Sequence, residues 1–148
     1  MTTAPDRERA EVSVVYETTV TAIGDQVPAF LGAGILILFA DSAPAELHPI
    51  SVLHAATVTD GGPLPGDRVE IGATSIEVLA VGHVVGDNLL NLGHMDLKSD
   101  GRDEAKLPGD VCVPKDCLVQ PAVGDVIRIL RPAPDPGADH SSNSQGAP

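Results

Sequence analysis

At 148 residues the chain is long enough for one domain with a hydrophobic core, and its net charge is −12. This charge argues against binding to nucleic acid or to an anionic membrane surface, because few cations are available to neutralise phosphates. Hydrophobic residues make up 43% of the chain but aromatic residues only 2%, so we expect a core of Val, Ile, Leu and Ala. The 15 Gly and 13 Pro favour many short strands over long helices.

Both ends of the chain are polar and unpatterned, and we expect residues 1–11 and 131–148 to be disordered. The ordered domain is therefore predicted to span residues 12–130. Its longest apolar run, residues 35–40, is too short to cross a membrane, and we see no secretory signal. Cys112 and Cys117 are spaced C-x4-C, which is neither a redox motif nor half of a zinc site, so we expect free thiols in a reducing cytoplasm.

The first half of the domain is predicted to hold three strands. Alternation over residues 12–21 indicates a half-buried strand, with one face made by Val12, Val14, Tyr16, Thr18 and Val20. Residues 35–39 form an apolar run that is typical of a fully buried strand. Pro44 suits the first turn of a short helix, which Pro49 should end at His48. Alternation then resumes in a third strand, with one face made by Ile50, Val52, His54, Ala56 and Val58.

The second half is predicted to hold shorter strands separated by turns. Residues 69–71 and 75–81 have the pattern of a hairpin around Gly72, and further strands are expected near residues 94–98, 110–113 and 125–130. Asp87 can cap a short helix that Gly93 closes. A Gly-Asp step precedes three of the strands, at residues 66–67, 109–110 and 124–125, and we interpret it as one kind of turn used three times. This pattern predicts a mainly β barrel or sandwich with one or two short helices.

His54 is the strongest candidate for chemistry. The chain has no G-x-S-x-G, H-E-x-x-H or P-loop motif, so histidines and the two cysteines are the remaining reactive groups. His54 is the only polar side chain on the predicted face of its strand. It is either a core histidine with satisfied ring nitrogens or a nucleophile, whose apolar surroundings keep the imidazole neutral and its lone pair available.

The other histidines and the cysteines are weaker candidates. His94 follows the helix-ending glycine, and it either contacts solvent at the start of a strand or donates to a developing anion. His48 and His83 are expected at the surface, and His140 lies in the predicted tail. Cys112 and Cys117 are most simply a buried small residue and a loop residue. No pair of histidines has a local spacing typical of zinc ligands.

Several stretches together resemble one protein family: VVYETTVTAIG, FADSAPAEL, VLH, AVGHVVGDNLLNLGHMDLKSDG and EAKLPGDVCV. They are similar to the glucitol/sorbitol-specific IIA component of the bacterial phosphoenolpyruvate-dependent sugar phosphotransferase system. The resemblance covers residues 12–130, and the run from Gly82 to Gly101 is its most specific part. It implies a mainly β fold, a small partly open β-barrel, which agrees with the strand pattern.

The resemblance also implies a function. A subunit of this family takes a phosphoryl group from the phosphohistidine of the carrier HPr and passes it to the IIB domain of the IIB/IIC sugar permease, without a metal or cofactor. Aligned through APAEL without a gap, the phosphorylated histidine of the family corresponds to His54, and the LGH histidine to His94, a candidate helper. The subunit is expected to be cytoplasmic and to reach the membrane only through the permease. A homodimer is an open alternative to a monomer, because small barrels can exchange hairpins.

One departure from the family concerns the residues after His54. Family members can carry a Cys and a second His there, whereas this sequence has Ala55 and Ala56. A nearby polar helper is thus missing, which increases the importance of His94. Two alternatives stay open: a non-catalytic barrel that binds a partner or senses the state of sugar transport, and a small metal-binding protein that uses His54 and His94.

Overall fold

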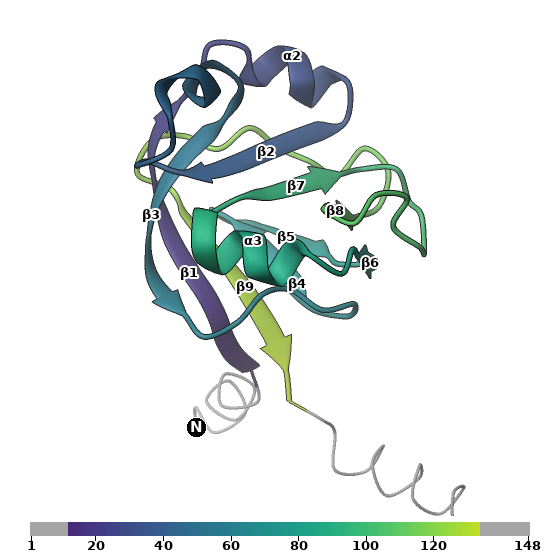
Figure 1. The fold of residues 1–148 in the computed structure, drawn as a ribbon. Coiled ribbons are helices and arrows are strands. Elements are labelled where there is room, and N and C mark those ends of the chain that lie inside the picture. Colours follow the sequence, from purple (N-terminus) through teal and green to yellow (C-terminus); the bar gives the residue numbers. More distant parts are fainter. Residues whose placement is uncertain (1–11, 134–148) are drawn as a thin grey trace, which may run out of the picture.

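A computed structural model describes residues 12–133, which form one curled nine-stranded sheet with three short helices (Figure 1). The strands are β1 (Val12–Ile23), β2 (Ile35–Ala40), β3 (Val52–Thr59), β4 (Arg68–Ile71), β5 (Thr74–Glu77), β6 (Ala80–Val81), β7 (Met95–Lys98), β8 (Asp110–Cys112) and β9 (Val126–Pro132). The helices are α2 (Val27–Gly32), the 3-10 helix η1 (Ala45–Ile50) and α3 (Val85–Leu92). Within the described range, no helix is long and apolar enough to cross a membrane.

The predicted domain boundaries, at residues 12 and 130, concern the two ends of the chain. Residues 1–11 and 134–148 lie outside the described residues, and so does His140. β9 continues to Pro132, so Arg131 and Pro132 belong to the sheet and not to the predicted tail. Both residues pair with β1, which explains why the strand runs past residue 130.

The sheet has the order β5-β4-β9-β1-β3-β2-β7-β8-β6 and is a partly open barrel, as predicted. Its two edge strands, β5 and β6, follow each other in the chain. Between them, the Val78 amide donates to the Asp67 carbonyl at 2.8 Å, and the Leu79 amide donates to the Cys112 carbonyl at 2.8 Å. Two adjacent residues therefore bind opposite ends of the sheet, which brings the edges together although β5 and β6 are not neighbours in the ladder.

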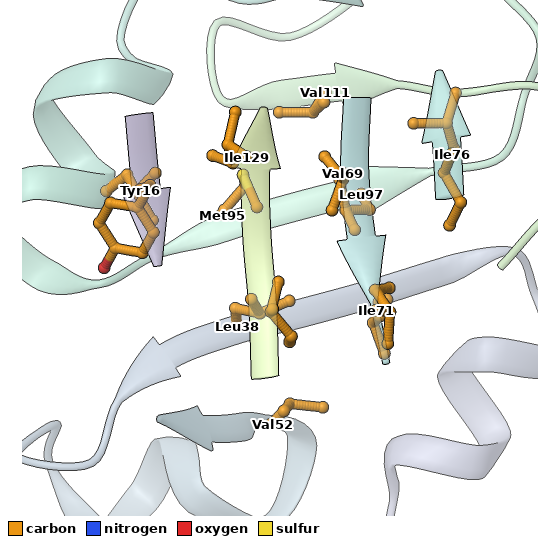
Figure 2. Close-up of a cluster of buried hydrophobic side chains, with 14 of the residues drawn as sticks. Tyr16, Leu38, Val52, Val69, Ile71, Ile76, Met95, Leu97, Val111 and Ile129 are labelled. Carbon is orange, nitrogen blue, oxygen red and sulfur yellow. The ribbon is translucent and has the colours of Figure 1, made fainter. Parts of the chain in front are cut away.

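Aliphatic side chains fill the inside of the barrel (Figure 2). The predicted use of Val, Ile and Leu is confirmed, and Leu36, Val52, Val69, Leu97 and Ile129 are completely buried. Tyr16 and Met95 add bulk, whereas Ala80 is the only buried alanine among residues 12–133. Burial of such side chains is the main driving force for a fold with so few aromatic rings.

Burial along β1 and β3 departs in part from the predicted alternation. Tyr16, Thr18 and Val20 are buried as predicted, but Val12 and Val14 are exposed because the register with β9 shifts between residues 14 and 16. In β3, Val52 and His54 are buried as predicted, but Leu53, predicted on the other face, is buried too, and Ala56, predicted on the face of His54, is exposed. His54 and Ala56 pair with Val20 and Thr18 of β1 without a register shift between them, so they do lie on one face. The register shifts on either side of this stretch, between residues 17 and 18 and between residues 20 and 22 of β1. Alternation with period two fails at such shifts.

Other local predictions are corrected as follows. β2 is not fully buried, because only Leu36 and Leu38 are buried and the other four residues of the strand are half-buried. The helix that begins after Pro44 does not end at His48, because the hydrogen bond from the Ser51 amide to the His48 carbonyl continues η1 through Pro49.

Two further corrections concern helices and the predicted hairpin. α3 begins at Val85, so Asp87 lies in its first turn rather than at the cap. The hairpin of β4 and β5 ends at Glu77, and β6 pairs with β8 instead. α2 was not predicted, since residues 27–32 show no clear period.

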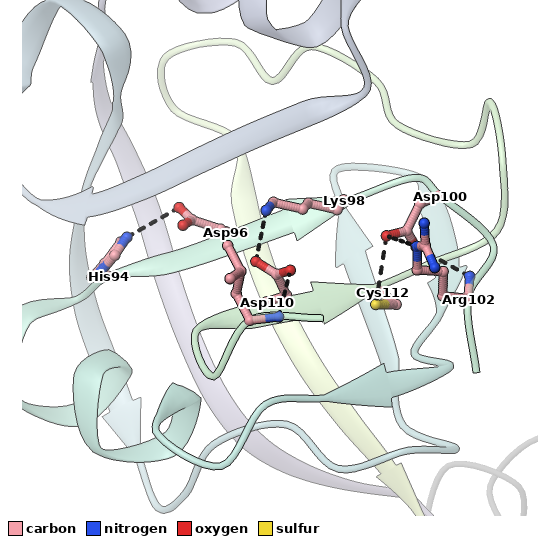
Figure 3. A network of polar contacts seen from close by, with 8 residues as sticks. His94, Asp96, Lys98, Asp100, Arg102, Asp110 and Cys112 are labelled. Carbon is pink, nitrogen blue, oxygen red and sulfur yellow. Dashed lines mark hydrogen bonds and ion pairs between the residues drawn. The ribbon is translucent and has the colours of Figure 1, made fainter. Parts of the chain in front are cut away.

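The three Gly-Asp turns do share one geometry. In each, a carboxylate oxygen of the aspartate accepts the backbone N–H three residues earlier: Leu64 for Asp67 (2.8 Å), Leu107 for Asp110 (3.3 Å) and Ala122 for Asp125 (2.8 Å). The aspartate amide bonds back to the carbonyl of that same earlier residue. Asp67 and Asp110 are also buried and paired, with Arg131 and Lys98 respectively, both at 2.8 Å (Figure 3 shows the second pair). Repeated turn chemistry is therefore confirmed.

Candidate functional site

The site is built around His54, near the start of β3. This strand lies between β1 and β2, and His54 stands opposite Val20 on one side and Ala40 on the other. Its side chain points into the barrel and is only 1% exposed. The Tyr16 ring meets the imidazole edge-on, with ring centroids 6.3 Å apart. Two neighbouring strands and an aromatic ring therefore hold the imidazole in a fixed position.

Both ring nitrogens of His54 have hydrogen-bond partners. Nε2 lies 2.7 Å from the Gly93 carbonyl oxygen, and Nδ1 lies 2.6 Å from the Thr18 hydroxyl. A carbonyl can only accept, so Nε2 carries the proton in a neutral ring and Nδ1 accepts from Thr18. The geometry thus selects one tautomer and agrees, in this conformation, with a satisfied core histidine.

Burial keeps the His54 ring neutral. Removal of the ring from water lowers the pKa of His54 below its ordinary value of 6.5, and the Gly93 hydrogen bond and the charge of Asp41 oppose this only in part. Asp41 is the residue that follows β2, and its amide donates to the His54 carbonyl at 2.9 Å. A neutral imidazole keeps one lone pair near neutral pH, which is the state a nucleophile needs.

Gly93 connects His54 to the outer part of the site. It ends α3 in a left-handed conformation (φ 65°), and its amide bonds back to the Leu89 carbonyl at 2.9 Å. A Cβ here would lie 2.6 Å from the Ala40 backbone nitrogen, so only glycine fits. This tight contact places the Gly93 carbonyl over Nε2, and the next residue is His94.

His94 faces outward from the same corner. Its ring stacks on Phe39 with centroids 4.1 Å apart, and its Nε2 lies 3.0 Å from an Asp96 carboxylate oxygen (Figure 3). The side chain is 23% exposed, so it is open to a partner while Asp96 and Phe39 fix its orientation. The structure therefore brings both predicted histidines to one corner. The Gly93 carbonyl bonds to His54, and His94 is the next residue in the chain.

A largely apolar hollow of about 440 Å³ adjoins His94. Its lining comes from the segment after β2 and from the end of α3: Phe39, Ser42, Ala43, Pro44, Leu47, Asn91, Leu92 and His94. Leu92 is 52% exposed beside it. Residues 10–67 and 83–97 contain no lysine or arginine, while Asp41, Glu46 and Asp87 are exposed close by in the chain. In the chain, acidic residues and no basic ones therefore flank the lining residues, and we call Asp41, Glu46 and Asp87 the acidic border.

Among residues 12–133, the remaining reactive groups do not form a second site. Burial and the neighbouring Asp100 carboxylate raise the pKa of the Cys112 thiol to about 11, so it stays protonated and unreactive. Burial also raises the pKa of Cys117. His83 is exposed, as predicted, and half-buried His48 has its Nε2 2.8 Å from the Ala43 carbonyl oxygen. Residues 12–133 contain no group of three or more His, Cys, Asp or Glu side chains that could hold a metal ion.

Comparison with known proteins decides the family. A family model described as "PTS system glucitol/sorbitol-specific IIA component" matches residues 15–128. The chain belongs to this family. It is 37% identical over 118 residues to the glucitol/sorbitol-specific EIIA components of Shigella flexneri and Escherichia coli (strain K12), a match that covers 80% of this chain and 96% of each relative. The resemblance seen in the sequence is thereby confirmed.

The fold of this chain is also found in a solved structure of another protein. The crystal structure of a PTS system IIA component from Enterococcus faecalis V583 superimposes with a TM-score of 0.61, over 75% of this chain and 96% of that one. The two sequences are 22% identical, so this likeness concerns the fold alone.

The structure adds residues that the pattern analysis did not assign to the site. Thr18 and Gly93 bind the two nitrogens of His54, and Phe39 and Asp96 orient His94. For Thr18 a signal was present, because a hydroxyl stood between Tyr16 and Val20 on the predicted buried face. For the other three residues no local signal existed, since these contacts depend on the packing of β2, α3 and β7.

Proposed function

We propose that this chain is the phosphocarrier subunit of a polyol phosphotransferase system, with His54 as the phosphoryl acceptor. It takes the phosphoryl group from phosphorylated HPr and passes it to the IIB domain of the IIB/IIC permease, as a protein-N-phosphohistidine–sugar phosphotransferase component. Family membership supports the role, and the neutral, oriented imidazole of His54 is the observation that supports the site. Phosphoryl transfer requires positioning and charge stabilisation more than covalent chemistry from the protein.

In this proposal Nε2 is the nitrogen that reacts. Nδ1 points to Thr18, which is wholly buried, so no phosphoryl group fits between them. Nε2 points to the Gly93 carbonyl at the corner of α3 and β7, next to His94. Because His54 is 1% exposed, this carbonyl has to move away before the donor can reach Nε2. The acceptor is therefore closed at rest and opens when a partner docks.

His94 is proposed as the helper that contacts the phosphoryl oxygens. Its ring is partly exposed, and the Asp96 carboxylate oxygen 3.0 Å from Nε2 fixes the direction in which the ring points. A protonated ring can donate from its other nitrogen to an anionic oxygen. This arrangement supplies a polar helper from the connection between α3 and β7, in a chain where Ala55 and Ala56 cannot supply one from β3.

The hollow beside His94 is proposed as the common docking site for both partners. Its apolar lining and the exposed Leu92 suit an apolar contact, and the acidic border without lysine or arginine suits a basic rim on HPr. Successive exchange with two partners requires transient complexes, which bury about 1,200 Å² or less. The proposal includes a cytoplasmic location, because HPr is found there. Light scattering distinguishes a monomeric subunit from a homodimer.

A direct experiment tests the proposal. The purified chain is incubated with phosphoenolpyruvate, enzyme I and HPr, and protein-bound phosphate is measured for acid lability and base stability. We expect uptake by the wild type and by His83→Ala, which removes an exposed histidine, and no uptake by His54→Ala. Undiminished uptake by His54→Ala would refute the site assignment.

The second candidate is a non-catalytic barrel that binds a partner. It is favoured by the full burial of His54, by the occupation of both its nitrogens and by Ala55-Ala56. Under this alternative the wild-type chain binds HPr, as seen by NMR titration, but takes up no phosphate. The same incubation therefore separates the two functions.

A further inference from the structure

Thr18 is the residue that binds the inner nitrogen of His54. It lies on β1, its side chain is completely buried, and its hydroxyl oxygen is 2.6 Å from Nδ1. Among residues 12–133, this is the only side-chain hydrogen bond of Thr18, and His54 has no other partner at Nδ1. The orientation of the Thr18 O–H is thus coupled to the protonation of a single ring nitrogen.

The two partners of the ring differ in what they can do. The Gly93 carbonyl only accepts, so it holds the proton on Nε2 and makes Thr18 the donor to Nδ1. A hydroxyl can rotate and either donate or accept. Gly93 and Thr18 together therefore hold the resting ring in the Nε2–H tautomer. In this tautomer Nε2 carries a proton and has no free lone pair.

We propose that Thr18 is a positioning residue of the phosphocarrier reaction: its hydroxyl reverses from donor to acceptor and holds the proton on Nδ1 while Nε2 carries the phosphoryl group. This inference rests on the proposed function of His54 and adds to it a residue that acts through the ring. A fixed partner on the second nitrogen is the usual device that sets the tautomer of a functional histidine.

The step is balanced in protons and electrons. When the Gly93 carbonyl moves away, the opened site admits water to the ring. Water delivers one proton to Nδ1 and removes one from Nε2, so the ring is neutral again and Thr18 keeps its own proton. The Nε2 lone pair then forms the new N–P bond, and the bond from phosphorus to the donor's histidine nitrogen breaks. That electron pair stays on the donor ring, which leaves as neutral imidazole because its other nitrogen is protonated. The phosphorylated His54 ring keeps its proton on Nδ1 and donates it to Thr18.

Substitutions at Thr18 separate this role from simple packing. Thr18→Val keeps the shape but leaves Nδ1–H without an acceptor, so we expect phosphoryl transfer from HPr to slow by about 10- to 100-fold, the usual effect of removing a partner that orients a histidine. Thr18→Ser keeps the hydroxyl and should restore most of the rate. Thr19→Val is the matched control, because the neighbouring Thr19 makes no hydrogen bond with His54 in the described part of the chain.

Ring NMR gives a readout that a structural role would not change. In protein with 15N-labelled histidine, long-range proton–nitrogen correlations identify the protonated and phosphorylated nitrogens. We expect Nε2–H in the resting wild type, and phosphate on Nε2 with a proton on Nδ1 after phosphorylation. Thr18→Val should show a mixture of tautomers, whereas Thr18→Ser should match the wild type.

Three outcomes would overturn the inference: phosphate on Nδ1, a wild-type transfer rate in folded Thr18→Val, or equal slowing in Thr19→Val. If Thr18→Val does not fold, the wild-type and Thr18→Ser spectra still decide, because phosphate on Nδ1 excludes the role. Failure of the proposed function appears separately, as a wild-type chain that takes up no phosphate or as uptake retained by His54→Ala.

Discussion

The burial of His54 predicts a specific acid sensitivity of the fold. In the unfolded chain the imidazole takes up a proton at its ordinary pKa of 6.5, whereas burial lowers the pKa in the folded state. Above 6.5 both states are neutral and His54 contributes no pH dependence. Below 6.5 the unfolded state binds a proton that the folded state does not, so the free energy of unfolding falls as the pH falls.

The size of the effect follows from one proton. The free energy of unfolding falls by at most ~1.4 kcal/mol for each pH unit below 6.5. This decrease continues until the pH reaches the lowered pKa of the folded state. Between about pH 7.5 and about pH 5.5 the wild type should therefore lose up to ~1.4 kcal/mol through this residue alone. His54→Gln has no titrating group at this position and should lack that part of the decline.

Urea unfolding at a series of pH values measures this difference. Subtraction of the His54→Gln curve from the wild-type curve removes the contributions of carboxylates and of the other histidines, which both proteins share. His83→Gln serves as the control at an exposed histidine and should follow the wild type. Parallel curves for wild type and His54→Gln would refute the reasoning that His54 is buried as a neutral ring.

Three further predictions concern other parts of the molecule. Asp67→Ala should lower the free energy of unfolding in urea by about 3 kcal/mol, because it removes a turn hydrogen bond and the two hydrogen bonds to partly exposed Arg131. Asp125→Ala, in the same kind of turn without an arginine partner, should lower it by about 1 kcal/mol. Equal losses would contradict the role given to the ion pair. His94→Gln should slow phosphoryl uptake about 100-fold by rapid quench, whereas HPr binding by NMR titration should weaken far less, because His94 is only one of the residues that line the hollow. Leu92→Glu should raise the Kd for HPr about tenfold by calorimetry, while Leu107→Glu, which is equally exposed but outside the hollow, should leave the Kd unchanged.

Much of the fold follows from local patterns. Alternation located β1 and β3, and the Gly-Asp steps predicted where β4, β8 and β9 begin, because the hydrogen bonds of these turns join residues only three positions apart. An error arose where a register shift changed the side that faces the core, as at Val14 of β1. A bulge depends on the partner strand, so the strand's own sequence does not reveal it.

For the site, the sequence by itself determined that His54 is a polar side chain on an apolar strand face, and its family resemblance determined which chemistry to expect there. Only the tertiary structure decided what binds the ring. Thr18 and Gly93 lie 36 and 39 residues away in the chain, on β1 and at the end of α3. Their contacts arise from strand pairing and from a close approach to Ala40 that only a glycine permits. The tautomer, the burial and the closed state of His54 are therefore properties of the assembled barrel.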